Sequence, residues 1–323
     1  MTTKWGLLST ARINDFIISA ARKSDRVHIT GVASRDGTRA EAYARDNDIA
    51  RAYGSYEELL ADPEIDAIYI PLPNSMHVDW TIRALESGKH VLCEKPLSRH
   101  AADVDRAFSV AERTGRLLME AFMYRHNPQT VRLKELVENG VVGTPQLVRA
   151  AFSFNLTRPN DIRMSAELEG GSLMDVGCYC VSGSRNLFGE PQLVFGEQVT
   201  TLSGVDKVFS GSMRMAGNVL ASFDSALTLT TRDELEVIGD EASLFVDDPW
   251  HCRSPGIELR SDDKVEEINV DAADSYQLQL ENFSDAINGT AEPLLGRDDA
   301  LGQAQAIEAL YRSADQGAPV TLG

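Results

Sequence analysis

The sequence predicts two domains of different fold class, an α/β domain with a parallel sheet followed by an α+β domain with an open, mainly antiparallel sheet. The chain has 323 residues, roughly two domain lengths, and 43% of them are hydrophobic, which can fill two cores. Strands and helices alternate over the first third, whereas after about Phe122 strands follow one another with only loops between them. We therefore expect one domain over residues 1–122 and a second over residues 123–323.

The first third repeats a strand–helix–strand unit. We expect strands at residues 4–9, 27–33, 67–70, 90–93 and 117–120, and helices at residues 14–23, 38–46, 56–61, 77–87 and 101–114. In the first helix apolar residues recur from Phe16 at i, i+1, i+4 and i+5, and Asn14 is a candidate N-cap. Gly88 follows the fourth helix, as is common at a helix C-terminus. Such units predict a parallel sheet covered by helices on both faces.

The rest of the chain is predicted to hold one helix, a series of strands and two closing helices. The expected helices are 128–139, 276–288 and 298–314, and the expected strands are 146–154, 193–201, 206–215, 218–229, 234–239, 242–246 and 256–259. Residues 227–230 alternate between leucine and threonine, which is typical of a strand with one exposed face. Short turns between consecutive strands favour an antiparallel sheet. We expect its uncovered face to be apolar, and therefore in need of a cover.

The charge balance excludes two classes of partner. The chain has 31 basic and 49 acidic residues and a net charge of -18, which repels phosphate backbones and anionic membrane surfaces. We therefore expect neither a nucleic acid nor a membrane as a partner. Seven basic residues are lysine and 24 are arginine, a bias that either a halophilic source or a GC-rich genome would explain.

The cysteines and the amino-terminal segment indicate a compartment. The four cysteines form no CxxC pair and no HExxH motif occurs, so we expect no metal site. Free thiols are typical of a reducing compartment. The sequence has no apolar run near 18 residues, and Met1 leads into a strand without a signal-peptide core. We expect a cytoplasmic protein.

A strand, a turn of small residues and a helix at the amino terminus form the context in which helix amides bind a dinucleotide pyrophosphate. This predicts a Rossmann-type domain, although an ordinary strand-to-helix turn is the alternative. The turn lacks GxGxxG, because serine, alanine and Asn14 stand at the three glycine positions. Alanine still allows a phosphate to approach the backbone. The predicted cofactor contacts of this turn are Ser9, Thr10, Ala11, Arg12 and Ile13.

The end of the second strand bears on the choice between NAD and NADP. An acidic residue there would bind the ribose of NAD, but this chain has Ser34 and Arg35, with Arg39 one turn later. A hydroxyl and guanidinium groups suit a 2′-phosphate. Exposed surface arginines are the simpler alternative. Asp36 is ambiguous, because it could pair with Arg35 or bind the ribose of NAD, so we expect NADP(H) to be preferred and NAD(H) to be possible.

Two later segments carry polar side chains suited to catalysis. Glu94 and Lys95 follow the buried strand 90–93, and open α/β sheets bind ligands at the carboxyl ends of their strands. A Gly-Gly turn then opens a helix on which Asp175 and Tyr179 are four residues apart and share a face. A structural salt bridge for Lys95 and a core-edge position for Tyr179 are the alternatives.

These motifs together resemble one family. The chain is similar over essentially its whole length to the glucose-fructose oxidoreductase / inositol dehydrogenase / MocA-type family. Within it the chain looks closest to the branch of NADP-dependent D-xylose 1-dehydrogenases and dimeric dihydrodiol dehydrogenases. The segments that carry the resemblance are Trp5-Gly6, residues 73–77 (PNSMH), Glu94-Lys95-Pro96, residues 120–125 (EAFMYR) and residues 170–179 (GGSLMDVGCY).

The resemblance implies a role for each candidate residue. Lys95 would lie beside the nicotinamide and the reacting hydroxyl, Tyr179 would donate or accept the proton, and Asp175 would hold a substrate hydroxyl. An adjacent ammonium group favours phenolate, which suits this pairing. Arg158 and Arg163 could reach sugar hydroxyls or could pair with carboxylates. The residues implied to line the cofactor are Pro71, Leu72, Pro73, Asn74, His77, Glu94 and Lys95.

The function implied is an NADP-dependent oxidoreductase that transfers a hydride between nicotinamide and a sugar, such as xylose, or a related cyclic alcohol or ketone. A dinucleotide-binding regulator without turnover is the alternative. The joint presence of Lys95, Asp175 and Tyr179 favours the enzyme. The family's usual assemblies further imply a homodimer or homotetramer formed through the open sheet.

Overall fold

A computed structural model describes residues 1–158, 160–262 and 264–322 and divides into two compact units. Unit 1 comprises Met1–Ser98, Ala102–Met123 and Tyr276–Leu301, and unit 2 comprises Arg99–Ala101, Tyr124–Ser275 and Gly302–Gly323. The predicted boundary between residues 122 and 123 lies one residue from the end of the Ala102–Met123 segment of unit 1. The prediction did not include the later segment Tyr276–Leu301, which also belongs to unit 1. None of the helices in the described residues is long and apolar enough to cross a membrane.

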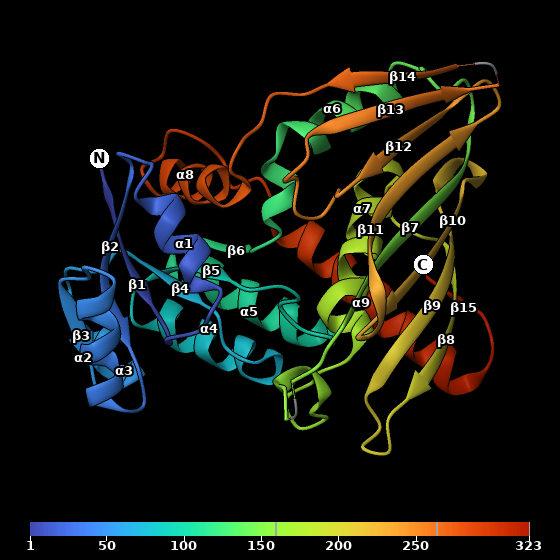
Figure 1. The fold of residues 1–323 in the computed structure, drawn as a ribbon. Helices are drawn as coiled ribbons and strands as arrows, with labels where there is room; N and C mark the ends of the chain where they lie inside the picture. The colour runs from blue at the N-terminus through green and yellow to red at the C-terminus, as the bar shows by residue number, and fades with distance from the viewer. Residues whose placement is uncertain (159, 263, 323) are drawn as a thin grey trace. The chain divides into compact units, whose positions relative to one another are not determined.

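Unit 1 is built on a six-stranded parallel sheet with the strand order β3-β2-β1-β4-β5-β6 (Figure 1). Parallel pairing was predicted and is confirmed, whereas the short strand β3 was missed. The strand order reverses between β1 and β4, and such switch points are where open α/β sheets bind ligands. The strands are β1 (Thr3–Leu7), β2 (Val27–Ala33), β3 (Arg51–Tyr53), β4 (Ala67–Ile70), β5 (His90–Cys93) and β6 (Leu118–Glu120).

Helices cover both faces of this sheet. Figure 1 shows α1 and α8 on one face and α4 and α5 on the other. The helices of this unit are α1 (Asn14–Ala21), α2 (Gly37–Asp46), α3 (Tyr56–Ala61), α4 (His77–Glu86), α5 (Ala101–Thr114) and α8 (Ser275–Ile287).

Contacts of α8 explain its return to unit 1. The indole Nε1 of Trp5 donates to Ser284 Oγ at 3.2 Å, and Arg26 pairs with Glu281 and Asp285 at 2.5 and 2.6 Å. Both Trp5 and Ser284 are buried. A helix from the end of the chain therefore completes the core around the first strand.

Unit 2 is built on a nine-stranded sheet with the order β14-β13-β12-β11-β7-β10-β9-β8-β15. Every neighbouring pair is antiparallel except β7 and β10, so the expected mainly antiparallel sheet is confirmed. The strands are β7 (Pro145–Asn155), β8 (Leu193–Thr200), β9 (Asp206–Arg214), β10 (Leu220–Ala226), β11 (Thr228–Gly239), β12 (Ser243–Asp247), β13 (Gly256–Ser261), β14 (Lys264–Asn269) and β15 (Val320–Thr321).

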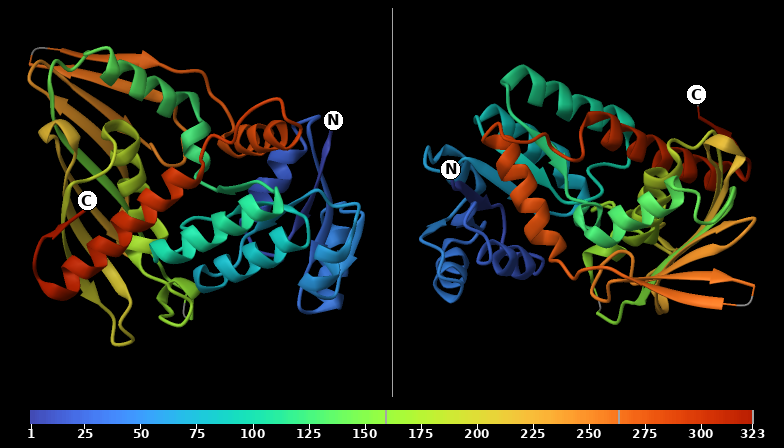
Figure 2. Two further views of the ribbon diagram at one scale, coloured as in Figure 1. Left: turned by 180° about the vertical axis from the view of Figure 1, so that it is seen from behind. Right: turned by 90° about the horizontal axis from the view of Figure 1, so that it is seen from above.

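One face of this sheet is covered by helices of the same unit. They are α6 (Pro128–Glu138), α7 (Cys178–Phe188) and the part of α9 (Arg297–Gln316) that follows Leu301. The views in Figures 1 and 2 agree that no helix of the described residues covers the opposite face. Side chains on the covered face, such as Phe152, Phe223 and Leu235, are buried.

The open face is mixed: the exposed Leu220 lies on it beside Ser222, but most of its side chains are polar or charged, so the expected apolar face is found only in part. Arg149 and Ser222 are exposed neighbours in register on β7 and β10. Arg232 pairs with Asp224 at 2.7 Å, and other charged side chains on this face form similar pairs. Since these positions alternate with the buried ones, each strand can carry a hydrated face without losing its core contacts.

Candidate active site

The turn between β1 and α1 is shaped by hydrogen bonds in place of the usual glycines. Asn14 does not cap the helix as predicted, because its buried side chain donates from Nδ2 to the carbonyl oxygen of Ser9 at 2.8 Å. Ser9 Oγ in turn accepts from the amide of Ala11 at 3.2 Å. The residue preceding α1 is Ile13, which cannot cap through its side chain. The turn thus has a defined shape at the switch point.

The charged residues that follow β2 have different roles, because Asp36 caps a helix and the two arginines are exposed. The Asp36 carboxylate caps α2, because it accepts from the backbone amide of Arg39 at 3.2 Å. Burial raises the pKa of Tyr56, and the guanidinium groups of Arg35 and Arg39 act against this rise because both lie near its hydroxyl. Ser34 is buried and bonds through Oγ to the amide of Asp36. The carboxylate is engaged at the helix, while both arginines are exposed at the carboxyl edge of the sheet.

The carboxyl ends of β4 and β5 bring the next group of predicted residues together. The Tyr69 hydroxyl donates to Glu94 Oε1 at 2.5 Å, and the Glu94 amide donates to the carbonyl of Ile70 at 3.0 Å. Lys95 follows directly, and Asn74 begins a short 3₁₀ helix that leads into α4. The segments around residues 71–77 and 94–96 therefore lie side by side.

His77 joins these two segments. Its ring is 1% exposed, with Nδ1 at 2.9 Å from the carbonyl oxygen of Pro96 and Nε2 at 2.8 Å from that of Leu72. Burial lowers the pKa of His77 to about 4, so the ring is neutral at neutral pH and its single N–H donates to one of these two carbonyl oxygens. His77 thus holds the loops whose residues were predicted to line the cofactor.

In unit 2 the predicted helix that carries Asp175 and Tyr179 has two parts. Leu173–Gly177 forms a π-helical turn, and α7 begins at Cys178. Asp175 lies in the π turn and Tyr179 in the first turn of α7, so the two residues lie on one continuous helical segment, as predicted, but that segment is not a regular α-helix throughout. Single π turns inside helices often mark functional sites.

A buried carboxylate that the sequence analysis missed fixes the start of this segment. Asp206 on β9 accepts hydrogen bonds from Ser172 Oγ, the Leu173 amide and the Tyr311 hydroxyl at 2.8 to 2.9 Å. Gly171 has φ +129°, and a Cβ there would lie 2.1 Å from Asp206 Oδ1. Burial raises the pKa of Asp206, and these donors oppose the rise. The Gly-Gly turn is therefore required for the close approach of Asp206.

Asp175 is held by one of the two predicted substrate arginines. Arg163 Nε lies 2.7 Å from Asp175 Oδ2, and its Nη1 lies 3.2 Å from Asp161 Oδ1. Arg158 also pairs with Asp161, at 3.4 Å. Both arginines thus pair with carboxylates of the chain, which was one of the two alternatives that the sequence analysis left open for them. The charge of Asp175 is the main cause that raises the pKa of Arg163.

Tyr179 lies among aromatic side chains that the sequence analysis did not select as site residues. Its ring centroid is 5.4 Å from that of Phe152, 5.7 Å from Tyr124 and 6.1 Å from Trp250, and the residue is 7% exposed. Trp250 is fixed by a hydrogen bond from Nε1 to the carbonyl oxygen of Ala151 at 3.1 Å. These rings come from three distant segments, so no local pattern in the sequence groups them.

A Rossmann-type sheet with a shaped turn at its switch point, joined to an α+β unit with an open sheet, defines a class of dinucleotide-dependent two-domain proteins. Comparison with known proteins identifies the family. Residues 4–122 match the model of the oxidoreductase family with an NAD-binding Rossmann fold, and residues 130–245 match the GFO/IDH/MocA C-terminal domain. The chain belongs to the Gfo/Idh/MocA oxidoreductase family.

Individual relatives agree with the predicted branch. The chain is 37% identical to D-xylose 1-dehydrogenase (NADP(+)) 2 of Haloferax volcanii, over 98% of this chain and 99% of the relative. It is 34% identical to trans-1,2-dihydrobenzene-1,2-diol dehydrogenase of Xenopus tropicalis, over 77% of each. A 3-ketoreductase from Actinomadura kijaniata, solved with NADP and TDP-benzene, has a TM-score of 0.92 and 26% identity, covering 97% of this chain and 98% of the other. The predicted family and enzyme class are confirmed.

We expect acidification to destabilise the protein through His77. The unfolded chain takes up this proton near pH 6.5 and the folded protein only near pH 4, so stability present above pH 6.5 is lost as the pH falls toward 4. The loss should be about 3 kcal/mol for this residue. Half-buried His90 and His126, whose pKa values are lowered to about 4 and about 3 mainly by desolvation, act in the same direction.

The measurement is the urea midpoint of wild type and His77→Gln between about pH 7.5 and about pH 4.5. The variant should show a smaller fall, whereas His28→Gln, at an exposed position, should behave as wild type. An equal fall in wild type and His77→Gln would contradict the assignment.

Proposed function

We propose that this protein is an NADP-dependent oxidoreductase that transfers a hydride between nicotinamide and a sugar, such as an aldose, or a related cyclic alcohol or ketone. The observation that carries the proposal is the surroundings of Tyr179. Aromatic rings on one side offer an apolar wall, and Asp175, whose carboxylate Arg163 orients, precedes it by one turn. Apolar walls with a few oriented polar groups are typical of small-molecule sites. The names of the curated relatives, a sugar dehydrogenase and a diol dehydrogenase, support the substrate class.

The residues of unit 1 fit a dinucleotide. The turn from Ser9 to Ile13 lies at the switch point, and the engagement of Asp36 at α2 leaves the two arginines as the charged groups for a 2′-phosphate. When bound, the nicotinamide supplies the hydride acceptor or donor. We propose that the segments 71–74 and 94–95 line the nicotinamide and its ribose, and that His77 positions them.

The chain's own residues would move the proton and orient the substrate. In the oxidative direction the Tyr179 hydroxyl oxygen takes the proton of the reacting hydroxyl, and in reduction it returns that proton. Lys95 places a positive charge beside the reacting oxygen, which favours its ionised form. Asp175 accepts a hydrogen bond from a second substrate hydroxyl, and Arg163 fixes the position of that carboxylate.

We expect Tyr179→Phe and Lys95→Ala each to lower kcat by about 10²- to 10⁴-fold, because each removes a group from the proton relay. The measurement is absorbance of the reduced nicotinamide during turnover of NADP⁺ with a panel of pentoses, hexoses and cyclic diols. Tyr53→Phe is the matched control, since the Tyr53 hydroxyl bonds to Asp62 beside the edge strand β3. Near-normal kcat in Tyr179→Phe at neutral pH would contradict the role of the tyrosine.

We expect Arg35→Ala to lower the ratio of kcat/KM for NADP⁺ to that for NAD⁺ by about 10- to 100-fold, because charge-assisted hydrogen bonds contribute roughly 1.5 to 3 kcal/mol. Arg45→Ala, an exposed change at the far end of α2, should leave the ratio unchanged. The assignment fails if wild type prefers NAD⁺ or if the ratio in Arg35→Ala equals that of wild type.

We further propose that the open face of the nine-stranded sheet joins copies of the chain as a homodimer or homotetramer. Its interspersed arginine and carboxylate side chains can pair with those of a second, symmetry-related copy. Light scattering at micromolar concentration should give twice or four times 35.4 kDa. Ser222→Arg at the centre of the face should lower that mass, and Ser87→Arg in unit 1 should not. A monomeric wild type would contradict the proposal.

A further inference from the structure

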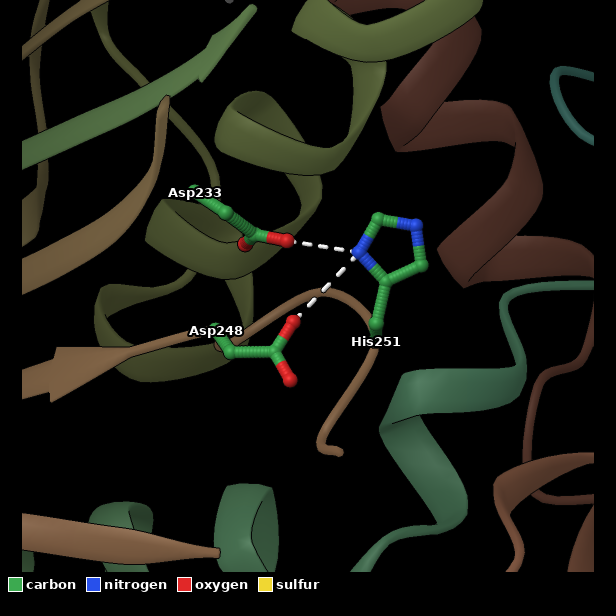
Figure 3. A group of neighbouring side chains, drawn as sticks. All are labelled: Asp233, Asp248 and His251. Atoms are coloured by element: carbon green, nitrogen blue, oxygen red, sulfur yellow. Dashed lines mark hydrogen bonds and ion pairs between the residues drawn. The ribbon is translucent and has the colours of Figure 1, made fainter. Parts of the chain in front are cut away.

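An aspartate–histidine pair in unit 2 has no part in the function proposed above. Asp233 lies on β11, and Asp248 and His251 lie in the loop between β12 and β13. His251 Nδ1 is 2.6 Å from Asp233 Oδ2 and 3.5 Å from Asp248 Oδ1. Figure 3 shows both carboxylates facing this nitrogen, with Nε2 on the far side of the ring. Among the residues that the structure describes, no hydrogen bond is made by Nε2.

The loop that carries His251 is held in one shape by the same carboxylates. Asp248 Oδ2 accepts from the amides of Arg253 and Ser254 at 2.5 and 3.2 Å. The Asp248 amide donates to the carbonyl oxygen of Asp233 at 2.8 Å, and the Trp250 amide donates to Asp233 Oδ1 at 3.3 Å. His251 is therefore oriented before any ligand binds.

The spacing of these three side chains would also suit a metal ion, because their ligand atoms lie within 4.8 Å of one another. A cation is already present, however. The Arg253 guanidinium lies 2.8 Å from Asp248 Oδ1 and 3.8 Å from Asp233 Oδ2. Together with the N–H of His251, it satisfies the carboxylates without a metal.

The pair is linked to Tyr179 through one aromatic ring. His251 packs edge-on against Phe152 with ring centroids 5.3 Å apart, and Phe152 packs against Tyr179 at 5.4 Å. The side chain of His251 is 39% exposed, so its ring is accessible. The neighbouring residue Trp250 also contacts Tyr179. His251 and Tyr179 thus pack against the same aromatic ring, that of Phe152.

We propose that His251 is a specificity residue whose Nε2 accepts a hydrogen bond from a hydroxyl of the sugar or cyclic alcohol. This inference rests on the proposed function. A neutral imidazole has one donor and one acceptor nitrogen, and a carboxylate partner fixes the proton on the nitrogen it contacts. In the neutral ring, Asp233 holds the proton on Nδ1, which leaves Nε2 as the acceptor. A site built to bind a hydroxyl discriminates strongly against an analogue that lacks it.

The test compares each substrate hydroxyl in wild type and in two variants. His251→Asn can still donate to Asp233 but lacks the Nε2 acceptor, and His251→Phe keeps the ring against Phe152. The substrates are D-xylose and its 2-, 3- and 4-deoxy derivatives, or the matching set for whichever sugar the panel above selects. In wild type, one deoxy derivative should lower kcat/KM by about 10- to 100-fold.

In both His251 variants kcat/KM for the parent sugar should fall by about 10- to 100-fold. For the deoxy derivative that wild type discriminates against, kcat/KM should then be little lower than for the parent sugar. His28→Asn should behave as wild type. If wild type turned over no member of the panel, neither a sugar nor a cyclic diol, the proposed function itself would be refuted. Normal turnover with the same discrimination in wild type and both variants would overturn this inference alone, as would loss of wild-type activity on chelation of metals.

Discussion

The buried carboxylate of Asp206 is the contact on which the candidate site of unit 2 depends. It binds a hydroxyl and a backbone amide at the start of the π turn and the phenol of Tyr311 on α9, so it joins a strand, a turn and a helix. A buried carboxylate is costly unless several donors surround it. Because Asp206 has these donors, the segment that carries Asp175 and Tyr179 has a single defined start.

Carboxylates also set the positions of cationic groups elsewhere in this acidic chain. Asp36 binds the start of α2 and leaves its neighbouring arginines exposed. Asp161 and Asp175 share Arg163, and Asp233 orients the ring of His251. In the last two cases a short aspartate fixes the position of a longer or titratable side chain. A protein with a net charge of -18 can thus keep defined local positive charge where an anionic or polar ligand would bind.

The two sheets meet different demands on their faces. The parallel sheet of unit 1 is covered on both sides, which requires apolar strands such as β4, all of whose residues are buried. The sheet of unit 2 is covered on one side, and its other face carries ion pairs. The same alternation of side chains that builds the covered core leaves room for this charged surface.

The amino-acid sequence alone determined the parallel sheet, the mainly antiparallel sheet and the family, because periodicity and motifs are local. It also placed Lys95 at the end of a strand and Tyr179 near the start of a helix. Only the tertiary structure decided that α8 completes the core beside Trp5, that Arg163 binds Asp175, and that Asp206 fixes the π turn. The physical reason is distance along the chain. A hydrogen bond between Trp5 and Ser284 joins residues that no local pattern connects, and their pairing follows from the packing of whole elements.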